Sequence, residues 1–284
     1  MNRTVYLNGD FLPEDEAKIS IFDRAVNFGD AIYEVAGVLD GKLVDFEHHM
    51  QRYYSSLEKL DIPPPLNAAQ ILEAFRQLIK LNQIDEGMVY MQITRGVADR
   101  DFVWPQGLTP TVFMFTQQKS NVENDQVETG VTLASVDDIR WARRDIKTVN
   151  LLAQVLAKKE AAAAGADEAL MVDGDGNITE CGCTSFFMVK GDQILTRALS
   201  NDILPGVTRR ALLALCEKHG LSLKETTFTL AQVLDADEAF ISSASSYVLP
   251  VVKVDNQAIG NGKPGAIYQR LHGLYIEQIK ATLT

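Results

Sequence analysis

The chain has 284 residues, of which 46% are hydrophobic and 23% are charged, and its formal net charge is −11. This length can bury a substantial core, and the balanced composition excludes a disordered chain. The negative charge argues against nucleic acid or an anionic membrane as a partner, because basic surfaces bind both. No apolar run approaches the roughly 20 residues that span a bilayer, and the first residues lack the apolar core of a secretory signal. We therefore expect a cytoplasmic protein.

The first third of the chain carries the signals of two β-hairpins. Asn8-Gly9 and Asp40-Gly41 lie between short apolar runs, and both pairs are typical of type I′ turns, which need positive φ angles. Further along, residues 88–94 and 111–116 have the composition of strands.

Two amphipathic helices are predicted between these strands. Apolar residues recur every three or four positions in residues 46–60, and the prolines at 63–65 end that pattern. Asn67 is expected to cap the second helix, over residues 68–82.

A polar stretch without periodicity, residues 117–126 (QQKSNVENDQ), follows and is typical of a linker. It predicts a small N-terminal α/β domain over residues 1–121 and a larger domain over residues 122–284. In the second part we expect strands, helices and one hairpin in this order: strand 131–136, helix 151–165, hairpin 168–189, strand 193–196, a helix from Pro205-Gly206 to Gly220, strands within 238–256 and a helix from about 264.

Glu180 stands beside a Cys-x-Cys pair, Cys181 and Cys183. Zinc sites usually draw on two spaced pairs of ligands, and no second pair or ligand-spaced histidine accompanies this one, so no metal site is predicted. In a strand the two thiols would point to one face and Glu180 to the other. The chain has three cysteines in all, which argues against a disulfide framework.

Lys147 lies between a strand-like segment and an apolar helix. The positive end of the helix dipole and partial desolvation would favour its neutral amine, the form that attacks a carbonyl carbon. Most lysines near helix starts are solvated surface groups, so this position alone leaves both interpretations open.

Gly206, Val207 and Thr208 lie where a helix is expected to begin. Free backbone N–H groups, a hydroxyl and the helix dipole can bind a phosphate there, and an ordinary capped helix is the alternative. The hydroxyl-rich turn at residues 242–247 could contribute to the same anion or be a plain turn.

Seven segments, taken in order, resemble the fold-type IV, class IV family of pyridoxal-phosphate enzymes. This family includes D-amino-acid aminotransferases, branched-chain aminotransferases and aminodeoxychorismate lyases. The resemblance implies an α/β (α+β) fold of two domains, a small N-terminal α/β domain and a larger C-terminal pseudo-barrel domain that binds the cofactor. The segments are DRAVNFGDAIYEV (23–35), HHMQRYYSSLEKL (48–60), YMQITRGVADRDF (90–102), DIRWARRDIKTVNLLAQVLAKKEA (138–161), ITECGCTSFF (178–187), ILPGVTRR (203–210) and SSASSYVLPV (242–251).

The resemblance implies pyridoxal 5′-phosphate as the cofactor and assigns roles residue by residue. Lys147 matches the lysine that binds the cofactor covalently and then moves a proton, and Glu180 matches the carboxylate that pairs with the pyridine nitrogen. Contacts to the phosphate or the ring of the cofactor are implied for Arg52, Val207, Thr208, Ser245 and Leu204.

Within the family, residues 90–102 most resemble the D-amino-acid aminotransferases. There a tyrosine, an arginine and a histidine hold the substrate carboxylate; Tyr33 and Arg100 match the first two, and Phe102, which cannot donate a hydrogen bond, stands at the third position. Ser185 stands where the class pattern has an asparagine. The resemblance implies a homodimer that transfers the amino group of a D-amino acid, such as D-alanine, to a 2-oxo acid by a ping-pong mechanism.

Three alternatives remain open at this level. A branched-chain aminotransferase acting on L-amino acids and an aminodeoxychorismate lyase would keep Lys147 and Glu180. A non-catalytic protein that binds pyridoxal phosphate is the third.

Overall fold

The computed structural model describes residues 3–284, which form two compact units. Unit 1 runs to Ser120 and also contains Ile146–Asn150 and Thr282–Thr284, whereas unit 2 contains Asn121–Asp145 and Leu151–Ala281. Lys147 therefore belongs to unit 1, although unit 2 supplies the residues on both sides of its segment. The assignment of residues 1–121 as a small domain and 122–284 as a cofactor-binding domain stays a prediction.

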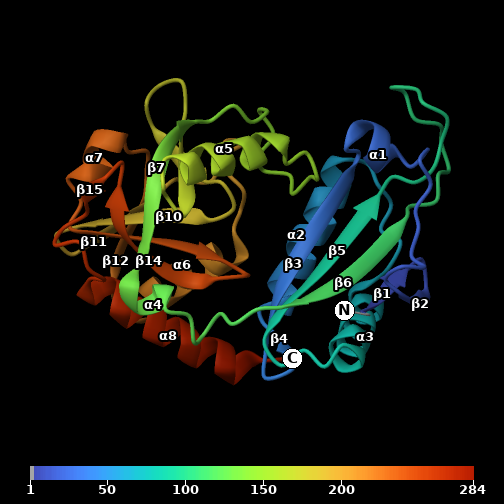
Figure 1. The fold of residues 1–284 in the computed structure, drawn as a ribbon, viewed down its shortest axis with the longest axis horizontal. Coiled ribbons are helices and arrows are strands. Elements are labelled where there is room, and N and C mark those ends of the chain that lie inside the picture. Colours follow the sequence, from blue (N-terminus) through green and yellow to red (C-terminus); the bar gives the residue numbers. More distant parts are fainter. Residues whose placement is uncertain (1–2) are drawn as a thin grey trace. The chain divides into compact units, whose positions relative to one another are not determined.

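Unit 1 is built on a six-stranded antiparallel sheet with the order β2-β1-β6-β5-β3-β4 (Figure 1). Both predicted hairpin turns are confirmed, because Asn8 and Asp40 have φ angles of 51° and 52° and are followed by glycines with positive φ. The strands are β1 (Thr4–Leu7), β2 (Asp10–Pro13), β3 (Ala31–Leu39), β4 (Lys42–Leu43), β5 (Gly87–Thr94) and β6 (Val112–Gln118).

Helices α2 (Phe46–Lys59) and α3 (Ala68–Leu81) pack on one face of this sheet (Figure 1). Their apolar stripes form a core with the strands in which Tyr53 and Phe75 are fully buried. The predicted cap is confirmed: the Asn67 side chain accepts a hydrogen bond from the Gln70 N–H in a capping box. The short helix α1 (Arg24–Phe28) precedes β3.

Unit 2 contains a nine-stranded mixed sheet with the order β12-β11-β10-β13-β14-β7-β8-β9, and β15 pairs with β14. The pairs β14/β7, β7/β8 and β11/β12 are parallel, and the other pairs are antiparallel. The strands are β7 (Val131–Asp137), β8 (Glu168–Val172), β9 (Ile178–Cys181), β10 (Ser185–Lys190), β11 (Gln193–Thr196), β12 (Ser222–Glu225), β13 (Glu238–Ser243), β14 (Tyr247–Val254) and β15 (Gln257–Ala258).

Five helices accompany this sheet: α4 (Gln126–Thr129), α5 (Leu152–Ala163), α6 (Val207–Lys218), α7 (Leu230–Leu234) and α8 (Ala266–Thr282). Helix α5 packs closely on β7 and β8 through small residues, with Ala157 and Ala161 against Ala134 and Ala169. Across residues 3–284, none of the helices has both the length and the apolar character required to traverse a membrane.

The prediction that Cys181 and Cys183 share one face of a strand is wrong. Strand β9 ends at Cys181 and β10 begins at Ser185, so a bend separates the two thiols; Cys181 is buried and Cys183 is exposed. Gly182 lies at this break, and a side chain does not fit there, because a Cβ atom would lie 2.8 Å from the Glu168 carboxylate and 2.9 Å from Cγ of Lys158.

Candidate active site

Lys147 lies in an extended segment beside β3 of unit 1. The Tyr33 N–H donates to the Lys147 carbonyl at 2.9 Å, and Thr148 forms a β-bridge with Ile32. The Lys147 Nζ atom lies 4.0 Å from the centre of the Tyr33 ring, which is a cation–π contact. Helix α5 begins at Leu152, so pairing with β3, and not a helix start, holds this lysine.

Tyr33 is the first ring of an aromatic stack on β3, β5 and β6. Its ring lies 5.6 Å from that of Tyr90, and the Tyr90 ring lies 4.7 Å from that of Phe115, both pairs being nearly parallel. Strand alternation puts these half-buried rings on the face opposite the helix-covered core. The Tyr90 hydroxyl donates to Gln92 at 2.8 Å, and burial raises the pKa of Tyr90. Lys147 thus stands at one end of an aromatic wall.

Arg52, on α2, is held by a buried carboxylate of β3. Its Nε and Nη2 atoms donate to the two oxygens of Glu34, each at 2.8 Å, and His49 Nδ1 lies 2.8 Å from Glu34 Oε2. Burial raises the pKa of Glu34, but the charge and hydrogen bonds of Arg52, with those of His49, outweigh it and hold the pKa at about 2. Burial lowers the pKa of His49 more than Glu34 raises it. The bidentate pair fixes the orientation of the Arg52 guanidinium.

Arg100 lies on an exposed loop that follows β5. Its guanidinium carbon is 5.4 Å from the Phe28 ring centre and 5.7 Å from that of Phe102. Within residues 3–284, no hydrogen bond or ring contact joins Arg100 to Tyr33 or Lys147. The structure therefore brings Lys147 and Tyr33 into contact, and the ring contacts of Arg100 are with Phe28 and Phe102.

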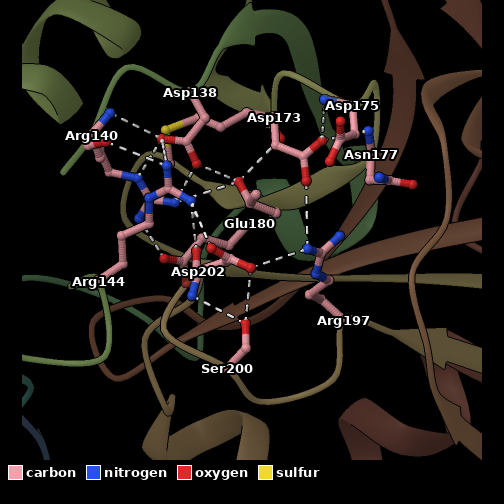
Figure 2. A network of polar contacts seen from close by, with 12 residues as sticks. Asp138, Arg140, Arg144, Asp173, Asp175, Asn177, Glu180, Arg197, Ser200 and Asp202 are labelled. Carbon is pink, nitrogen blue, oxygen red and sulfur yellow. Dashed lines mark hydrogen bonds and ion pairs between the residues drawn. The ribbon is translucent and has the colours of Figure 1, made fainter. Parts of the chain in front are cut away.

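In unit 2, Glu180 is a buried carboxylate on β9 that lies beside Arg140 (Figure 2). Arg140 Nη1 lies 2.5 Å from Glu180 Oε1, and the Leu204 N–H donates to the two carboxylate oxygens at 3.2 and 3.3 Å. Burial raises the pKa of Glu180 more than Arg140 and the Leu204 N–H lower it. A further positive group would therefore stabilise its ionised form.

Arg140 is divided between two carboxylates. Besides Glu180 it binds Asp138, with Nε–Oδ1 at 2.9 Å and Nη2–Oδ2 at 2.7 Å, and the Thr179 hydroxyl donates to the same Asp138 at 2.6 Å. Burial raises the pKa of Asp138, but Arg140 and Thr179 lower it further, so the net shift is downward. Asp138 is thus an ionised anchor that directs Arg140 toward Glu180.

The first turn of α6 offers groups that suit an anion. Its N-cap, Gly206, provides no side-chain cap, and within residues 3–284 the buried Thr208 Oγ1 has no hydrogen-bond partner. A Cβ atom at Gly206 would lie 2.6 Å from Ser185 Oγ. Ser185, which stands where the class pattern has an asparagine, therefore borders this turn directly. Ser245 lies in the turn between β13 and β14, with its Oγ 3.5 Å from Ser243 Oγ. Uncapped N–H groups and an unpaired hydroxyl are the usual elements of a phosphate site.

Sequence reasoning missed the partners that orient these groups. Arg140 lies in a polar stretch with Asp138 and Arg144 that is typical of a solvated loop, and Glu34 lies in an otherwise apolar strand. A signal existed in both cases. Three arginines precede Lys147 within eight residues, and a lone glutamate in a buried strand requires a partner, because buried charges are paired.

Comparison with known proteins gives consistent results. The family model described as amino-transferase class IV matches residues 31–254. A D-alanine aminotransferase of Staphylococcus haemolyticus is 37% identical over 94% of this chain and 94% of its own. A branched-chain amino acid aminotransferase of Escherichia coli has a TM-score of 0.92 at 23% identity, over 98% of this chain and 95% of its own. The corresponding T.th. enzyme, solved with pyridoxamine 5′-phosphate, has a TM-score of 0.90 at 25% identity, over 100% and 98%. These structural matches confirm the expected α/β (α+β), fold-type IV architecture.

Proposed function

Because this chain belongs to the class IV aminotransferases, we propose that it transfers the amino group of a D-amino acid, such as D-alanine, to a 2-oxo acid. The match along 94% of both chains to a D-alanine aminotransferase carries this proposal. The reaction is ping-pong: the first 2-oxo acid leaves before the second one binds. The branched-chain enzymes share the fold at lower identity, which favours this reading over L-specific transamination.

The residues present fit pyridoxal 5′-phosphate. Glu180 is a buried carboxylate whose pKa is raised, because its donors do not fully offset the cost of burying the charge. Thr208 has a buried hydroxyl without a partner in the described chain, and α6 begins without a side-chain cap. When bound, this cofactor supplies an aldehyde that takes up an amino group and an electron-poor ring that stabilises negative charge at the substrate α-carbon.

Each residue then has a proposed task. Glu180 holds the pyridine nitrogen protonated, and Arg140 keeps Glu180 oriented and ionised from the other side. Lys147 would hold the cofactor through Nζ, and its amine would move a proton to or from the substrate α-carbon. The Tyr33 ring keeps Nζ in place.

The phosphate is assigned to charged and uncapped groups. Arg52, fixed by Glu34, supplies the positive charge, and Val207 and Thr208 supply N–H groups and a hydroxyl at the first turn of α6. Ser245 adds a second hydroxyl, and Leu204 offers an apolar side chain to the ring while its N–H holds Glu180.

The substrate carboxylate is assigned to Tyr33 and Arg100. Arg100 can bind a carboxylate through two parallel hydrogen bonds, whereas Phe102 contributes no donor and instead packs its ring 5.5 Å from that of Phe28. This arrangement binds the carboxylate with one donor fewer than a site with histidine at that position.

The test is a panel of amino donors with the purified protein and pyridoxal phosphate. We expect D-alanine with 2-oxoglutarate to give pyruvate and D-glutamate, and Lys147→Ala to abolish both turnover and the borohydride-reducible bond between cofactor and protein. Lys159→Ala, at an exposed lysine of α5, is the matched control. Turnover of L-leucine, with no turnover of D-alanine, would favour the branched-chain alternative. Release of pyruvate from aminodeoxychorismate in the absence of an amino acceptor would favour the lyase.

A homodimer is the proposed assembly. Two adjoining segments of unit 1, one that runs into α1 and one that follows β5, expose large apolar side chains, and a β-bridge between Asp23 and Val97 joins the two segments. Exposed apolar groups at this density are typical of interfaces. The exposed side chains are Ile21 (75%), Phe22 (51%), Val26 (57%), Phe102 (76%) and Val103 (77%). Sedimentation of the wild type and of Val103→Asp tests this; a wild-type monomer would refute it.

A cytoplasmic location is also proposed. The three cysteines are free, as in a reducing compartment, and the composition is that of a globular protein. Fractionation of producing cells tests it, with activity recovered in the soluble cytoplasmic fraction as the expected outcome.

A further inference from the structure

Two separate segments provide the donors of Glu180. Arg140 belongs to the segment that follows β7, and Leu204 belongs to the loop that precedes α6. Both segments are irregular, so no helix or strand fixes the position of either donor. Something must hold the two segments in register.

Arg144 contacts both segments (Figure 2). On the α6 side, Nη1 of its side chain lies 3.5 Å from both the carbonyl oxygen and Oδ1 of Asp202, and its main-chain N–H donates to the Asn201 carbonyl at 3.0 Å. On the β7 side, Nη2 donates to the Arg140 carbonyl at 3.3 Å and lies 3.6 Å from Asp138 Oδ1. One side chain therefore joins the loop of Leu204 to the segment of Arg140.

The outer end of this network is anchored as well. Asp202 Oδ2 lies 3.3 Å from Arg197 Nη2 and accepts a hydrogen bond from the Ser200 hydroxyl at 3.1 Å, and Arg197 Nη2 lies 3.4 Å from Asp173 Oδ2. Charges of opposite sign thus alternate along the series Asp173, Arg197, Asp202, Arg144 and Asp138 (Figure 2). Such a chain resists local displacement because each member has more than one partner.

We propose that Arg144 is a positioning residue for Glu180: it fixes the Arg140 and Leu204 segments relative to each other, so that the carboxylate keeps both of its donors. Arg144 does not touch the carboxylate and acts through these two residues. The catalytic consequence rests on the proposed function, in which Glu180 pairs with the pyridine nitrogen. The contacts of Arg144 themselves do not depend on the proposed function.

The positioning role requires a guanidinium because its nitrogen atoms point in several directions. It reaches two main-chain carbonyls and two carboxylates, which the single nitrogen of a lysine cannot do. Arg144→Lys therefore keeps the positive charge and loses the side-chain contacts that join the two segments. Arg143→Lys is the matched control, because Arg143 is adjacent, half-exposed and paired with Asp145 at 2.9 Å.

Hydrogen exchange on the full-length protein tests the contact without reference to activity. We expect faster exchange of the Leu204 amide in Arg144→Lys than in the wild type and in Arg143→Lys, with and without pyridoxal phosphate. Equal Leu204 exchange in all three proteins overturns the proposal. Because this measurement needs no turnover, it decides the positioning role even if the wild type proves to have no transaminase activity, which would refute the proposed function alone.

The pH profile of the D-alanine half-reaction tests the consequence for the reaction. The charged groups around Glu180 are Arg140 and Asp138, with Arg144 beyond them, and the Cys181 thiol is its neighbour on β9. Loss of a donor favours the protonated carboxyl, so the acidic limb in Arg144→Lys should move up by about one pH unit, a tenfold change in the ionised fraction. KM for D-alanine should stay within about twofold at the plateau, because Arg144 is not among the residues assigned to the substrate carboxylate. An unmoved limb together with a raised KM contradicts a role through Glu180.

Discussion

Lys147 and Tyr33 meet through both main chain and side chain. The Tyr33 N–H donates to the Lys147 carbonyl at 2.9 Å, and the Lys147 Nζ lies 4.0 Å from the centre of the Tyr33 ring. The amine is therefore positioned by a residue that also carries a hydroxyl, and the two parts of the tyrosine can be tested separately.

Removal of the Tyr33 hydroxyl should affect substrate binding and spare the lysine. In Tyr33→Phe the ring and its contact with Nζ remain, so covalent attachment of the cofactor should be unchanged. KM for D-alanine should rise roughly tenfold, because a hydrogen bond to a charged group contributes about 1.5 kcal/mol. Steady-state kinetics and borohydride trapping measure the two effects. An unchanged KM would remove the hydroxyl from the carboxylate site.

Replacement of Glu180 should slow the chemical step. Glu180→Gln keeps the shape of the side chain and loses the charge that, in the proposed function, would hold the pyridine nitrogen protonated, so the half-reaction with D-alanine should slow by roughly 100-fold. Rapid-mixing absorbance measures this rate. Glu168→Gln is the control, because Glu168 is also buried and is paired with Lys158 at 2.9 Å. Equal rates in the two variants would contradict the assigned role.

Arg100 is predicted to bind substrate and not cofactor. Arg100→Ala should raise KM for D-amino acids and lower kcat, while the affinity for pyridoxal phosphate is retained, because charge pairing with the carboxylate is lost. Arg76→Ala, at an exposed arginine of α3, is the control. Phe102→His adds a donor on the same loop and should lower KM. Wild-type kinetics in Arg100→Ala would exclude Arg100 from the site.

Thr208→Val should have opposite effects on stability and on cofactor binding. Without cofactor, the change removes a buried hydroxyl that has no partner in the described chain, so the free energy of unfolding should rise by about 1 kcal/mol. The affinity for pyridoxal phosphate should fall roughly fivefold, since a phosphate hydrogen bond is lost.

Urea unfolding and cofactor titration measure the two quantities for Thr208→Val. In the control, Thr179→Val, a hydroxyl that donates to Asp138 at 2.6 Å is lost, so the unfolding free energy should fall. If Thr208→Val lowers the stability of the cofactor-free protein, the hydroxyl has a role in folding and not in phosphate binding.

Acid should destabilise unit 1 through Glu34. Its pKa falls from an ordinary value of 4.5 to about 2 on folding, so its contribution is complete above pH 4.5 and is lost as the pH drops toward 2. The full loss is roughly 3 kcal/mol, at about 1.4 kcal/mol per unit. His49, whose pKa lies below 6.5 in the folded protein, acts in the same direction from pH 6.5 downward. The raised pKa of Glu180 acts in the opposite direction, with its contribution present below pH 4.5 and lost as the pH rises.

Urea unfolding of the cofactor-free protein between pH 7 and 3 checks this. Glu34→Gln should be less stable at pH 7 and lose less stability on acidification than the wild type. Glu73→Gln, at an exposed carboxylate of α3, should follow the wild type. The same pH dependence in the wild type and Glu34→Gln would contradict the assignment.

Local pattern predicted the longer elements of the fold. Hairpin turns at Asn8 and Asp40 and the cap at Asn67 follow from side-chain chemistry within a few residues, so the sequence alone identifies them. The five-residue helices α1 and α7 escaped prediction, because one turn of helix leaves no periodic trace. The close approach of Glu168 and Lys158 to Gly182 escaped as well, since these residues are distant from the glycine in sequence.

The resemblance named candidate site residues from the sequence alone. It did not identify the residues that orient them through tertiary contacts. Lys147 and Glu180 stand in recognisable segments, but nothing near Lys147 in sequence shows that it pairs with β3. Arg140 and Arg144 look like solvated loop residues, and only the folded chain shows that their side chains pair with Asp138 and are just 6% and 11% exposed. Long-range pairing of charges leaves no local pattern.

The pairing of Ile146–Asn150 with β3 also affects the order in which the protein can fold during synthesis. A ribosome that has released residues 1–120 has produced most of unit 1, yet the segment that carries Lys147 and the final residues that pair with Leu43 are still missing. Unit 1 can therefore be completed only after most of unit 2 has emerged. A fragment ending at residue 120 would lack Lys147 altogether, so the two units cannot be exchanged between relatives by a single crossover in the gene.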